Sequence, residues 1–229
     1  MTIAAILFDK DGTLFDFGPT WESWAQAFLL RAAGQDQRRA THLGQQIGFD
    51  LPNRRFRPDS IVIAGTAAEV AEALTPHLPE IAPAQLYDMM NQEAETAPQV
   101  EVVPLAPFLD RLRARGFRLG VATNDAEAPA RAHLGTAGVV DRFDFIAGFD
   151  SGHGAKPGPG QLLAFARTVG VEPENVVMVG DSTHDLIAGR SAGMITVGVL
   201  TGLAPEDDLA ALADVVLPDI GHLPGWLAL

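Results

Sequence analysis

I-L-F-D-K-D-G-T-L, residues 6–14, is the stretch that decides the fold. The apolar run from Ile3 to Phe8 predicts a buried parallel strand, and the chain turns abruptly polar at Asp9. In open α/β sheets, ligands bind at the carboxyl ends of the strands. Side chains two residues apart in an extended segment point the same way, so Asp9 and Asp11 are expected to share a site. Gly12 allows the backbone to turn back closely after them.

Two carboxylates in one site repel each other by about 4 kcal/mol at 4 Å in a medium of effective dielectric 20. A cation, or a proton held by one of them, removes that repulsion. Mg²⁺ suits a site that offers only oxygen ligands and that also binds phosphate. Simple capping of a loop by Asp9 and Asp11 is the alternative, because Asp often precedes Gly in turns. The pair alone therefore leaves a metal site and a capped turn as alternatives.

Composition excludes several classes of function. The 229 residues are 47% apolar, enough for a sizeable core in one large domain or in a domain with an insert. The formal charge of −13 argues against a nucleic-acid backbone or an anionic membrane surface as partner. The absence of Cys excludes disulfides, thiolate catalysis and Cys-ligated zinc. Neither a signal peptide nor an apolar run of membrane-spanning length is found, so we expect a soluble, cytoplasmic protein.

The segment that follows the first strand has helical patterning and contains no convincing strand. The expected helices are Trp21 to Ala33 with Thr20 as N-cap, Asp36 to Ile47, Ser60 to Leu74 and Ala84 to Ala97. This region, residues 16–97, is interpreted as a helical insert placed directly after the strand that carries Asp9.

From Pro98 onward, strands alternate with helices of about ten residues. The expected strands are Phe117 to Ala122, Phe143 to Ala147, Val176 to Val179, Ile195 to Val199 and Asp214 to Leu217. Such alternation indicates a parallel sheet with right-handed crossovers. The predicted fold is therefore α/β: a Rossmann-like parallel sheet flanked by helices, formed by residues 1–15 and 98–229, with an inserted α-helical cap domain at residues 16–97.

The ends of the next two strands carry residues that can bind a phosphate. Thr123 and Asn124 follow one strand, and a hydroxyl and a backbone N–H at a helix start can hold a phosphate oxygen. Lys156 follows the other in a glycine-rich loop. The chain has only two lysines, and Lys10 is expected to point away from Asp9 and Asp11. Lys156 is therefore the natural counter-charge, although a solvated loop lysine is the alternative.

The fourth strand end carries two more carboxylates, in G-D-S-T-H-D at residues 180–185. Asp181 and Asp185 are four residues apart and are expected on one face of a helix start, where they would complete an oxygen cage for Mg²⁺. Helix capping by Asp181 is the alternative and is compatible with a metal role.

Taken in order, D-K-D-G-T-L at 9–14, Thr123, Lys156 and G-D-S-T-H-D at 180–185 resemble the four motifs of the haloacid dehalogenase superfamily. The resemblance runs over the whole chain, and the helical insert lies where that superfamily places its type-1 cap. Within the superfamily, the sequence is most similar to the phosphoglycolate phosphatase-like branch. His184 departs from the pattern, since many relatives carry a small polar residue there.

The resemblance implies a role for each motif residue. Asp9 would be the nucleophile that forms an aspartyl-phosphate, and Asp11 would be the general acid and then the base. The phosphate-binding residues would be Gly12, Thr123, Asn124 and Lys156, of which Thr123 and Lys156 also count as catalytic. The cofactor would be Mg²⁺, held by Asp9, Asp11 (through its backbone carbonyl), Asp181 and Asp185.

The expected function is that of a Mg²⁺-dependent phosphatase acting on a small phosphorylated metabolite, as a monomer or homodimer. A sugar phosphomutase like β-phosphoglucomutase is the alternative, because it uses the same chemistry. A phospho-accepting switch of the receiver type is disfavoured, because receivers carry the accepting Asp after a later strand and lack a cap.

The irregular stretch Pro52 to Pro58 concentrates Arg54, Arg55 and Arg57 in an otherwise acidic protein. A cap that closes over the strand ends could present a guanidinium, above all from Arg55 or Arg57, to the far end of the substrate. Arg binds carboxylate bidentately, which would favour 2-phosphoglycolate over a neutral sugar phosphate. A solvated or cap-packing patch is the alternative interpretation.

Overall fold

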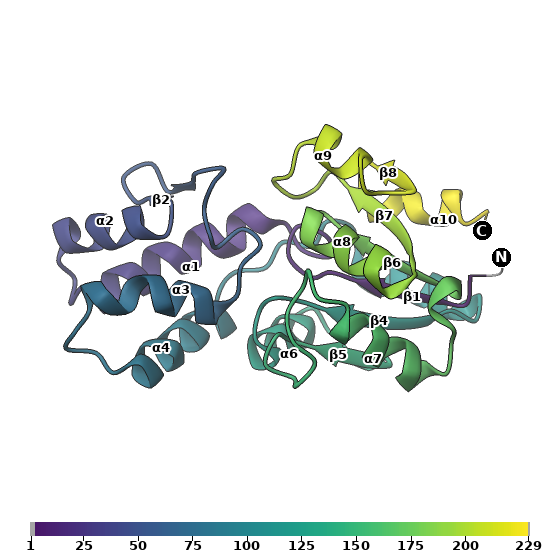
Figure 1. Cartoon of the computed structure of the whole chain (residues 1–229), viewed down its shortest axis with the longest axis horizontal. Coiled ribbons are helices and arrows are strands. Elements are labelled where there is room, and N and C mark those ends of the chain that lie inside the picture. Colours follow the sequence, from purple (N-terminus) through teal and green to yellow (C-terminus); the bar gives the residue numbers. More distant parts are fainter. Residues whose placement is uncertain (1–2, 229) are drawn as a thin grey trace.

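The computed structural model describes residues 3–228, which form two parts lying side by side (Figure 1). One part is built on a parallel sheet, and the other is a group of helices inserted after the first strand. No helix among residues 3–228 is long and apolar enough to cross a membrane.

The main sheet of the described chain has six parallel strands in the order β5-β4-β1-β6-β7-β8. β1 lies in the interior, where Ile6 is in register with Leu119 of β4 on one side and Val177 of β6 on the other. The predicted parallel α/β sheet is therefore confirmed. The strands are β1 (Ala5–Phe8), β4 (Arg118–Ala122), β5 (Phe145–Ala147), β6 (Val176–Gly180), β7 (Ile195–Val199) and β8 (Val215–Leu217).

Both faces of this sheet are covered. Ile6 and Phe8 belong to one apolar cluster and Ala5 and Leu7 to another, and all four side chains are fully buried. Burial on both faces explains why the strand is a continuous apolar run rather than an alternating one. The helices that contribute to the first cluster are α5 (Leu105–Ala114), α6 (Glu127–Thr136) and α10 (Leu223–Trp226); those of the second are α7 (Gly160–Val169) and α8 (Thr183–Ala192). The short helix α9 (Glu206–Ala210) lies between β7 and β8.

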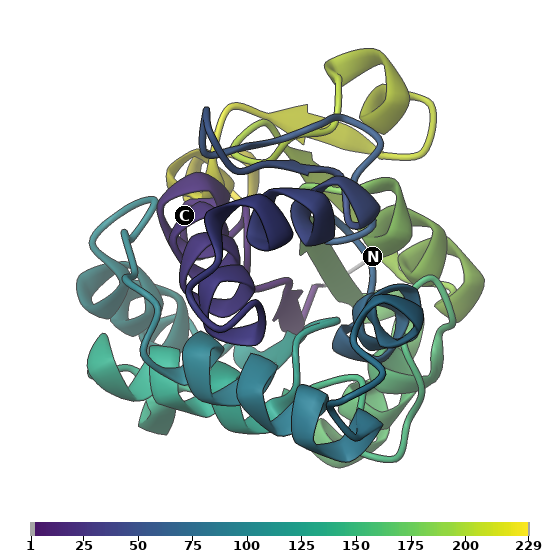
Figure 2. The ribbon, with the colours of Figure 1, turned by 90° about the vertical axis from the view of Figure 1, so that its left-hand side faces the viewer.

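The inserted helices pack around an apolar cluster of their own, in which the rings of Trp24 and Phe28 stack at 5.2 Å. All members of the cluster fall within the segment expected to form a cap. In the view from the left-hand side of Figure 1, the inserted helices lie in front of the sheet (Figure 2). They are α1 (Phe17–Ala32), α2 (Gln37–Gln46), α3 (Ala67–Leu74) and α4 (Pro83–Glu95), and we call them together the cap.

The chain enters and leaves the cap along two segments that pair with each other. The N–H of Asp16 donates to the carbonyl of Val100 at 2.8 Å, and the N–H of Val102 donates to the carbonyl of Leu14 at 3.0 Å. The cap is thus attached to the sheet directly beyond β1.

The first cap helix begins four residues earlier than predicted. Asp16, not Thr20, is the N-cap: its carboxylate accepts from the N–H of Gly18 at 3.2 Å. Pro19 does not prevent this start, because proline is tolerated in the first turn. The hydroxyl of Thr20 donates instead to the carbonyl of Pro98, at 2.9 Å, on the returning segment.

The prediction that the insert contains no strand is wrong. A short antiparallel hairpin joins β2 (Phe49–Asp50) to β3 (Arg55–Phe56), and Arg54 in its turn has a φ of +52°. Strands of two residues are too short to show an alternating pattern, which is why sequence periodicity does not reveal them.

The helix predicted from Ser60 begins only at Ala67. Thr66 and Glu69 form a capping box, in which the Thr66 hydroxyl accepts from the N–H of Glu69 at 3.3 Å and the Glu69 carboxylate accepts from the N–H of Thr66 at 2.6 Å. Residues 61–65 form a loop ahead of the helix.

Candidate active site

The neighbouring ends of β1, β4 and β6 bring the predicted site residues together. Asp9 follows β1, Thr123 follows β4 and Asp181 follows β6, and β1 pairs directly with the other two strands. One pocket lies over these strand ends, and its empty volume is about 680 Å³, part of it open to solvent. All the predicted catalytic and metal-binding residues line it: Asp9, Asp11, Thr123, Lys156, Asp181 and Asp185.

Three carboxylates form a tight cluster at the base of this pocket. Asp9, Asp181 and Asp185 each offer an oxygen within 4.8 Å of the others. Their exposed fractions are only 6%, 5% and 1%. Buried charges of one sign are strongly unfavourable unless a cation accompanies them.

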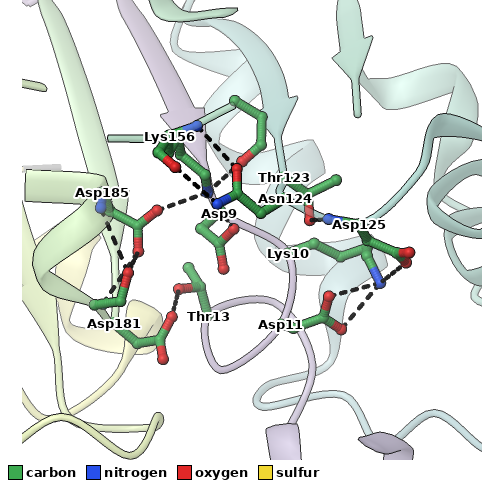
Figure 3. A network of polar contacts seen from close by, with 12 residues as sticks. Asp9, Lys10, Asp11, Thr13, Thr123, Asn124, Asp125, Lys156, Asp181 and Asp185 are labelled. Atoms are coloured by element: carbon green, nitrogen blue, oxygen red, sulfur yellow. Dashed lines mark hydrogen bonds and ion pairs between the residues drawn. The ribbon is translucent and has the colours of Figure 1, made fainter. Parts of the chain in front are cut away.

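Lys156 supplies one such cation. Its buried ammonium donates to Asp9 Oδ1 at 2.5 Å, to Asp185 Oδ1 at 2.6 Å and to the carbonyl of Ala122 at 2.8 Å (Figure 3). Asn124 holds the loop that presents it, because its amide accepts from the N–H of Lys156 and donates to the carbonyl of Lys156, both at 2.9 Å. One ammonium beside three carboxylates leaves the cluster short of positive charge.

The pKa values of these carboxyl groups also reflect the excess of negative charge. Burial, together with the charges of Asp185 and Asp11, raises the pKa of Asp9 to about 7, even though Lys156 opposes the shift. Burial and the neighbouring charges of Asp9 and Asp185 also raise the pKa of Asp181 well above its usual range. An all-oxygen donor set with excess negative charge fits Mg²⁺, so Asp9, Asp181 and Asp185 are the residues that would hold it.

Mg²⁺ is expected to raise the melting temperature more at about pH 8 than at about pH 5.5. Folding raises the pKa of Asp9 from 3.8 to about 7. A carboxyl with a raised pKa stabilises the fold while protonated, and this stabilisation is lost as the pH rises from about 4 to about 7. Mg²⁺ binds the deprotonated oxygens and so offsets the loss where it is greatest. Thermal unfolding with Mg²⁺ or chelator at both pH values measures this.

An Asp181→Asn variant is the control for that experiment, since it should lose most of the Mg²⁺ effect. An increase that is equal at both pH values, or larger at the lower one, would contradict the proposed metal site.

Gly12 lies against one of these carboxylates. Its φ is +81°, and a Cβ at this position would lie 2.3 Å from Oδ2 of Asp181. Asp181 also accepts a hydrogen bond of 3.3 Å from the hydroxyl of Thr13. A glycine is therefore required for the turn and for the placement of Asp181, whereas phosphate binding by Gly12 stays a prediction.

Helix α8 begins differently from the expectation. Ser182 is its N-cap, and the Ser182 hydroxyl donates to Asp185 Oδ2 at 2.7 Å in a capping box. Asp181 precedes the helix, so the two aspartates do not share a helical face. The capping alternative for Asp181 is thereby removed, and Asp185 uses one oxygen for the cap and the other for Lys156.

Asp11 lines the pocket but its carboxylate is not part of the three-carboxylate cluster. It accepts from the ammonium of Lys10, at 2.9 Å to Oδ1 and 2.8 Å to Oδ2. The expectation that Lys10 points away from Asp11 is therefore wrong. β1 ends at Phe8, and beyond it the chain turns, with the N–H of Leu14 donating to the carbonyl of Lys10 at 2.9 Å, so side chains no longer alternate. A metal contact from the backbone carbonyl of Asp11 stays a prediction.

The side chains of Thr123 and Asn124 differ in their remaining capacity for hydrogen bonds. The Thr123 hydroxyl accepts from the N–H of Asp125 at 3.0 Å and lines the pocket. The Asn124 amide, besides holding Lys156, donates to the carbonyl of Ala64 in the cap at 2.8 Å. Phosphate binding by Asn124 is thus a prediction for its backbone N–H rather than for its side chain.

The structure does not bring Arg55 and Arg57 to this pocket. Both are exposed, they border a separate hollow with Asp50, and Arg57 pairs with Asp59 at 3.1 Å. No arginine is among the described residues that line the active-site pocket. The hairpin packs Phe56 inward, and successive side chains of a strand point to opposite faces, so Arg55 is turned outward.

Arg54→Ala, Arg55→Ala and Arg57→Ala are accordingly each expected to change KM for 2-phosphoglycolate by less than about twofold. None of the three side chains contributes to the pocket lining. Steady-state kinetics on the single variants measures this. An increase of about tenfold in any of them would restore the interpretation that the cap arginines contact a substrate carboxylate.

Sequence analysis missed the cap residues that face the site. Phe17, Trp21 and Trp24 of α1 line the pocket, as do Thr66 and Asn91 from elsewhere in the cap. The spacing of the three aromatic residues places them on one face of a helix. Periodicity identifies such a face, but it does not say whether the face meets a core or a substrate pocket.

Comparison with known proteins agrees with this geometry. The family model of the haloacid dehalogenase-like hydrolases matches residues 3–193. The chain is 31% identical over 233 residues to a phosphoglycolate phosphatase of Rhodospirillum rubrum, covering 97% of this chain and 90% of that protein.

Solved structures share the fold. A predicted phosphoglycolate phosphatase from Haemophilus somnus has a TM-score of 0.76 at 19% identity, covering 99% of this chain and 98% of that one. A β-phosphoglucomutase from Clostridium difficile has a TM-score of 0.67 at 18% identity, covering 97% and 93%. The chain therefore belongs to the haloacid dehalogenase-like hydrolases, in their phosphoglycolate phosphatase-like branch.

Proposed function

We propose that the protein is a Mg²⁺-dependent phosphatase that hydrolyses small phosphorylated metabolites through an aspartyl-phosphate on Asp9. The observation that carries the proposal is the buried group formed by Asp9, Asp181, Asp185 and the Lys156 ammonium where β1 and β6 end side by side. The relatives named phosphoglycolate phosphatase support the same reaction class.

In the first step, a carboxylate oxygen of Asp9 attacks the phosphorus, and the bond from phosphorus to the ester oxygen breaks. Asp11 gives a proton to that leaving oxygen. The Thr123 hydroxyl donates to a phosphoryl oxygen, and the positive charge of the nearby Lys156 ammonium stabilises the negative charge that builds up during transfer. Mg²⁺, when bound, neutralises carboxylate and phosphoryl charge.

In the second step, Asp11 takes a proton from a water molecule, whose oxygen attacks the phosphorus of the aspartyl-phosphate. The bond between phosphorus and Asp9 breaks, which releases inorganic phosphate and restores the carboxylate. Asp11 lies at the pocket wall with 11% of its side chain exposed, so it is accessible both to a leaving group and to water.

2-Phosphoglycolate is the first substrate to test, because several relatives are named for its hydrolysis. The pocket gives no support for carboxylate recognition by arginine, since no described lining residue is an arginine. The cap side is instead largely apolar, with Trp21, Val62 and Met90 among its lining residues. Small phosphate esters with neutral leaving groups therefore belong beside 2-phosphoglycolate in any substrate panel.

Release of inorganic phosphate from such a panel, with Mg²⁺ and ranked by kcat/KM, tests the proposal. We expect repeated turnover on at least one small phosphate ester. A single stoichiometric phosphorylation without turnover would indicate a phospho-accepting switch instead. Turnover of a sugar phosphate that depends on a catalytic bisphosphate would indicate a phosphomutase.

A further inference from the structure

A second group of charges lies directly behind Asp11, and the phosphatase chemistry above does not use it. Its centre is Lys10, whose side chain is fully buried. The Lys10 ammonium contacts both oxygens of Asp11 at 2.8–2.9 Å and lies 3.1 Å from Oδ2 of Asp125 (Figure 3). Asp125 is also buried, in the turn after β4.

This arrangement fixes the ammonium in one place. Removing an ammonium from water is strongly unfavourable, and carboxylates with good geometry offset that cost. Asp125 is itself fixed, because its Oδ1 accepts from the N–H of Ala126 at 2.8 Å. Lys10 therefore holds the carboxylate of Asp11 at the pocket wall against a rigid support.

His133 of α6 links the same ammonium to the cap. Its Nδ1 lies 2.8 Å from Nζ of Lys10, and its Nε2 lies 2.6 Å from the carbonyl oxygen of Ala94 in α4. A carbonyl only accepts, so Nε2 carries the hydrogen and Nδ1 accepts from Lys10. Burial and the charge of Lys10 lower the pKa of His133 to about 4, in agreement with a neutral ring.

We infer that Lys10 is a positioning residue that holds Asp11 for proton transfer, and that His133 ties the position of Lys10 to the cap. The inference rests on the proposed role of Asp11 as the acid of the first step. Proton transfer requires hydrogen-bond reach, so a displaced carboxylate would protonate the leaving oxygen poorly. Attack of Asp9 on the phosphorus does not need Lys10 or His133.

Two probe substrates of similar size separate this role from a merely structural one. p-Nitrophenyl phosphate releases a weakly basic phenolate that needs little protonation, whereas benzyl phosphate releases a strongly basic alkoxide. The ratio of their kcat/KM values reports on the acid in the first step, because kcat/KM covers the steps up to loss of the leaving group.

In Lys10→Met, we expect kcat/KM for benzyl phosphate to fall at least about tenfold more than kcat/KM for p-nitrophenyl phosphate. His133→Leu should change the ratio in the same direction. His133→Gln, which keeps a donor and an acceptor, should retain the wild-type ratio within about threefold. The two His133 variants keep Lys10, so they also test the inference if Lys10→Met fails to fold.

Equal losses of kcat/KM on both substrates in Lys10→Met would overturn the inference. So would equal benzyl-to-nitrophenyl ratios of kcat/KM in His133→Leu and His133→Gln. In either case, turnover by the wild-type protein would leave the proposed function intact. A wild-type protein that hydrolyses neither these probes nor any phosphate ester would overturn the proposed function and this inference with it.

Discussion

Asp9→Asn is expected to lower kcat at least about 10³-fold, which corresponds to about 4 kcal/mol of transition-state stabilisation. The change removes the attacking carboxylate but almost no volume. The fold should tolerate it, because burial already raises the pKa of Asp9 to about 7 and a neutral side chain relieves the crowding of charge. Lys156 keeps its contact with Asp185 at 2.6 Å. Steady-state phosphate release, together with the melting temperature, measures both effects.

Asp208→Asn, at an exposed position of α9, is the matched control and should keep wild-type activity. Activity of Asp9→Asn within about tenfold of wild type would show that another group accepts the phosphoryl moiety.

Removal of divalent metal is expected to abolish turnover, and Mg²⁺ is expected to restore it. Three buried carboxylates, those of Asp9, Asp181 and Asp185, have oxygens within 4.8 Å of one another. Among the described residues, the lysine that pairs with this cluster is Lys156. Without a further cation, this cluster repels the negative charge of a phosphate ester. Activity after exhaustive chelation, and after titration with Mg²⁺, measures the dependence.

Ca²⁺ is expected to replace Mg²⁺ poorly, since its larger and looser ligand shell would place the nucleophile and the phosphate less accurately. Full activity in chelator, or equal rates with Ca²⁺ and Mg²⁺, would rule out the site as described.

The parallel sheet and its strand ends could be predicted from the sequence because of simple burial patterns. Strands buried on both faces are continuous apolar runs, and each run ends where the chain reaches the rim of the sheet. β7 has the predicted bounds Ile195–Val199. Asp9, Thr123 and Asp181 meet because β1 lies between β4 and β6, and periodicity along the chain does not give that strand order.

The cap was predicted less well, because its details depend on tertiary contacts. The β2–β3 hairpin is only two residues long on each side, and the loop before α3 looks helical by composition. The capping box of Thr66 and Glu69 is a signal that could have placed the start of α3.

Side-chain direction was the least predictable feature. Beyond Phe8 the chain leaves the strand, and Lys10 turns toward Asp11 and Asp125 instead of away. Arg55 points away from the pocket because Phe56 occupies the inner face of its strand and packs on Phe49 with ring centroids 4.7 Å apart. A local sequence pattern predicts neither the direction of Lys10 nor that of Arg55. Each direction depends on which residues from distant parts of the chain pack beside it.

Chemical trapping of the covalent intermediate tests the role of Asp9 most directly. An Asp11→Asn variant lacks the proposed base of the second step, so it should accumulate the phosphorylated enzyme when mixed with Mg²⁺ and p-nitrophenyl phosphate, whose leaving group needs little protonation. Rapid quenching followed by borohydride reduction converts an aspartyl-phosphate to homoserine, which peptide mass spectrometry locates. Homoserine at position 9, formed in step with the release of p-nitrophenolate, is the predicted result. Release of p-nitrophenolate with position 9 unmodified, or with the modification at another residue, would contradict the account.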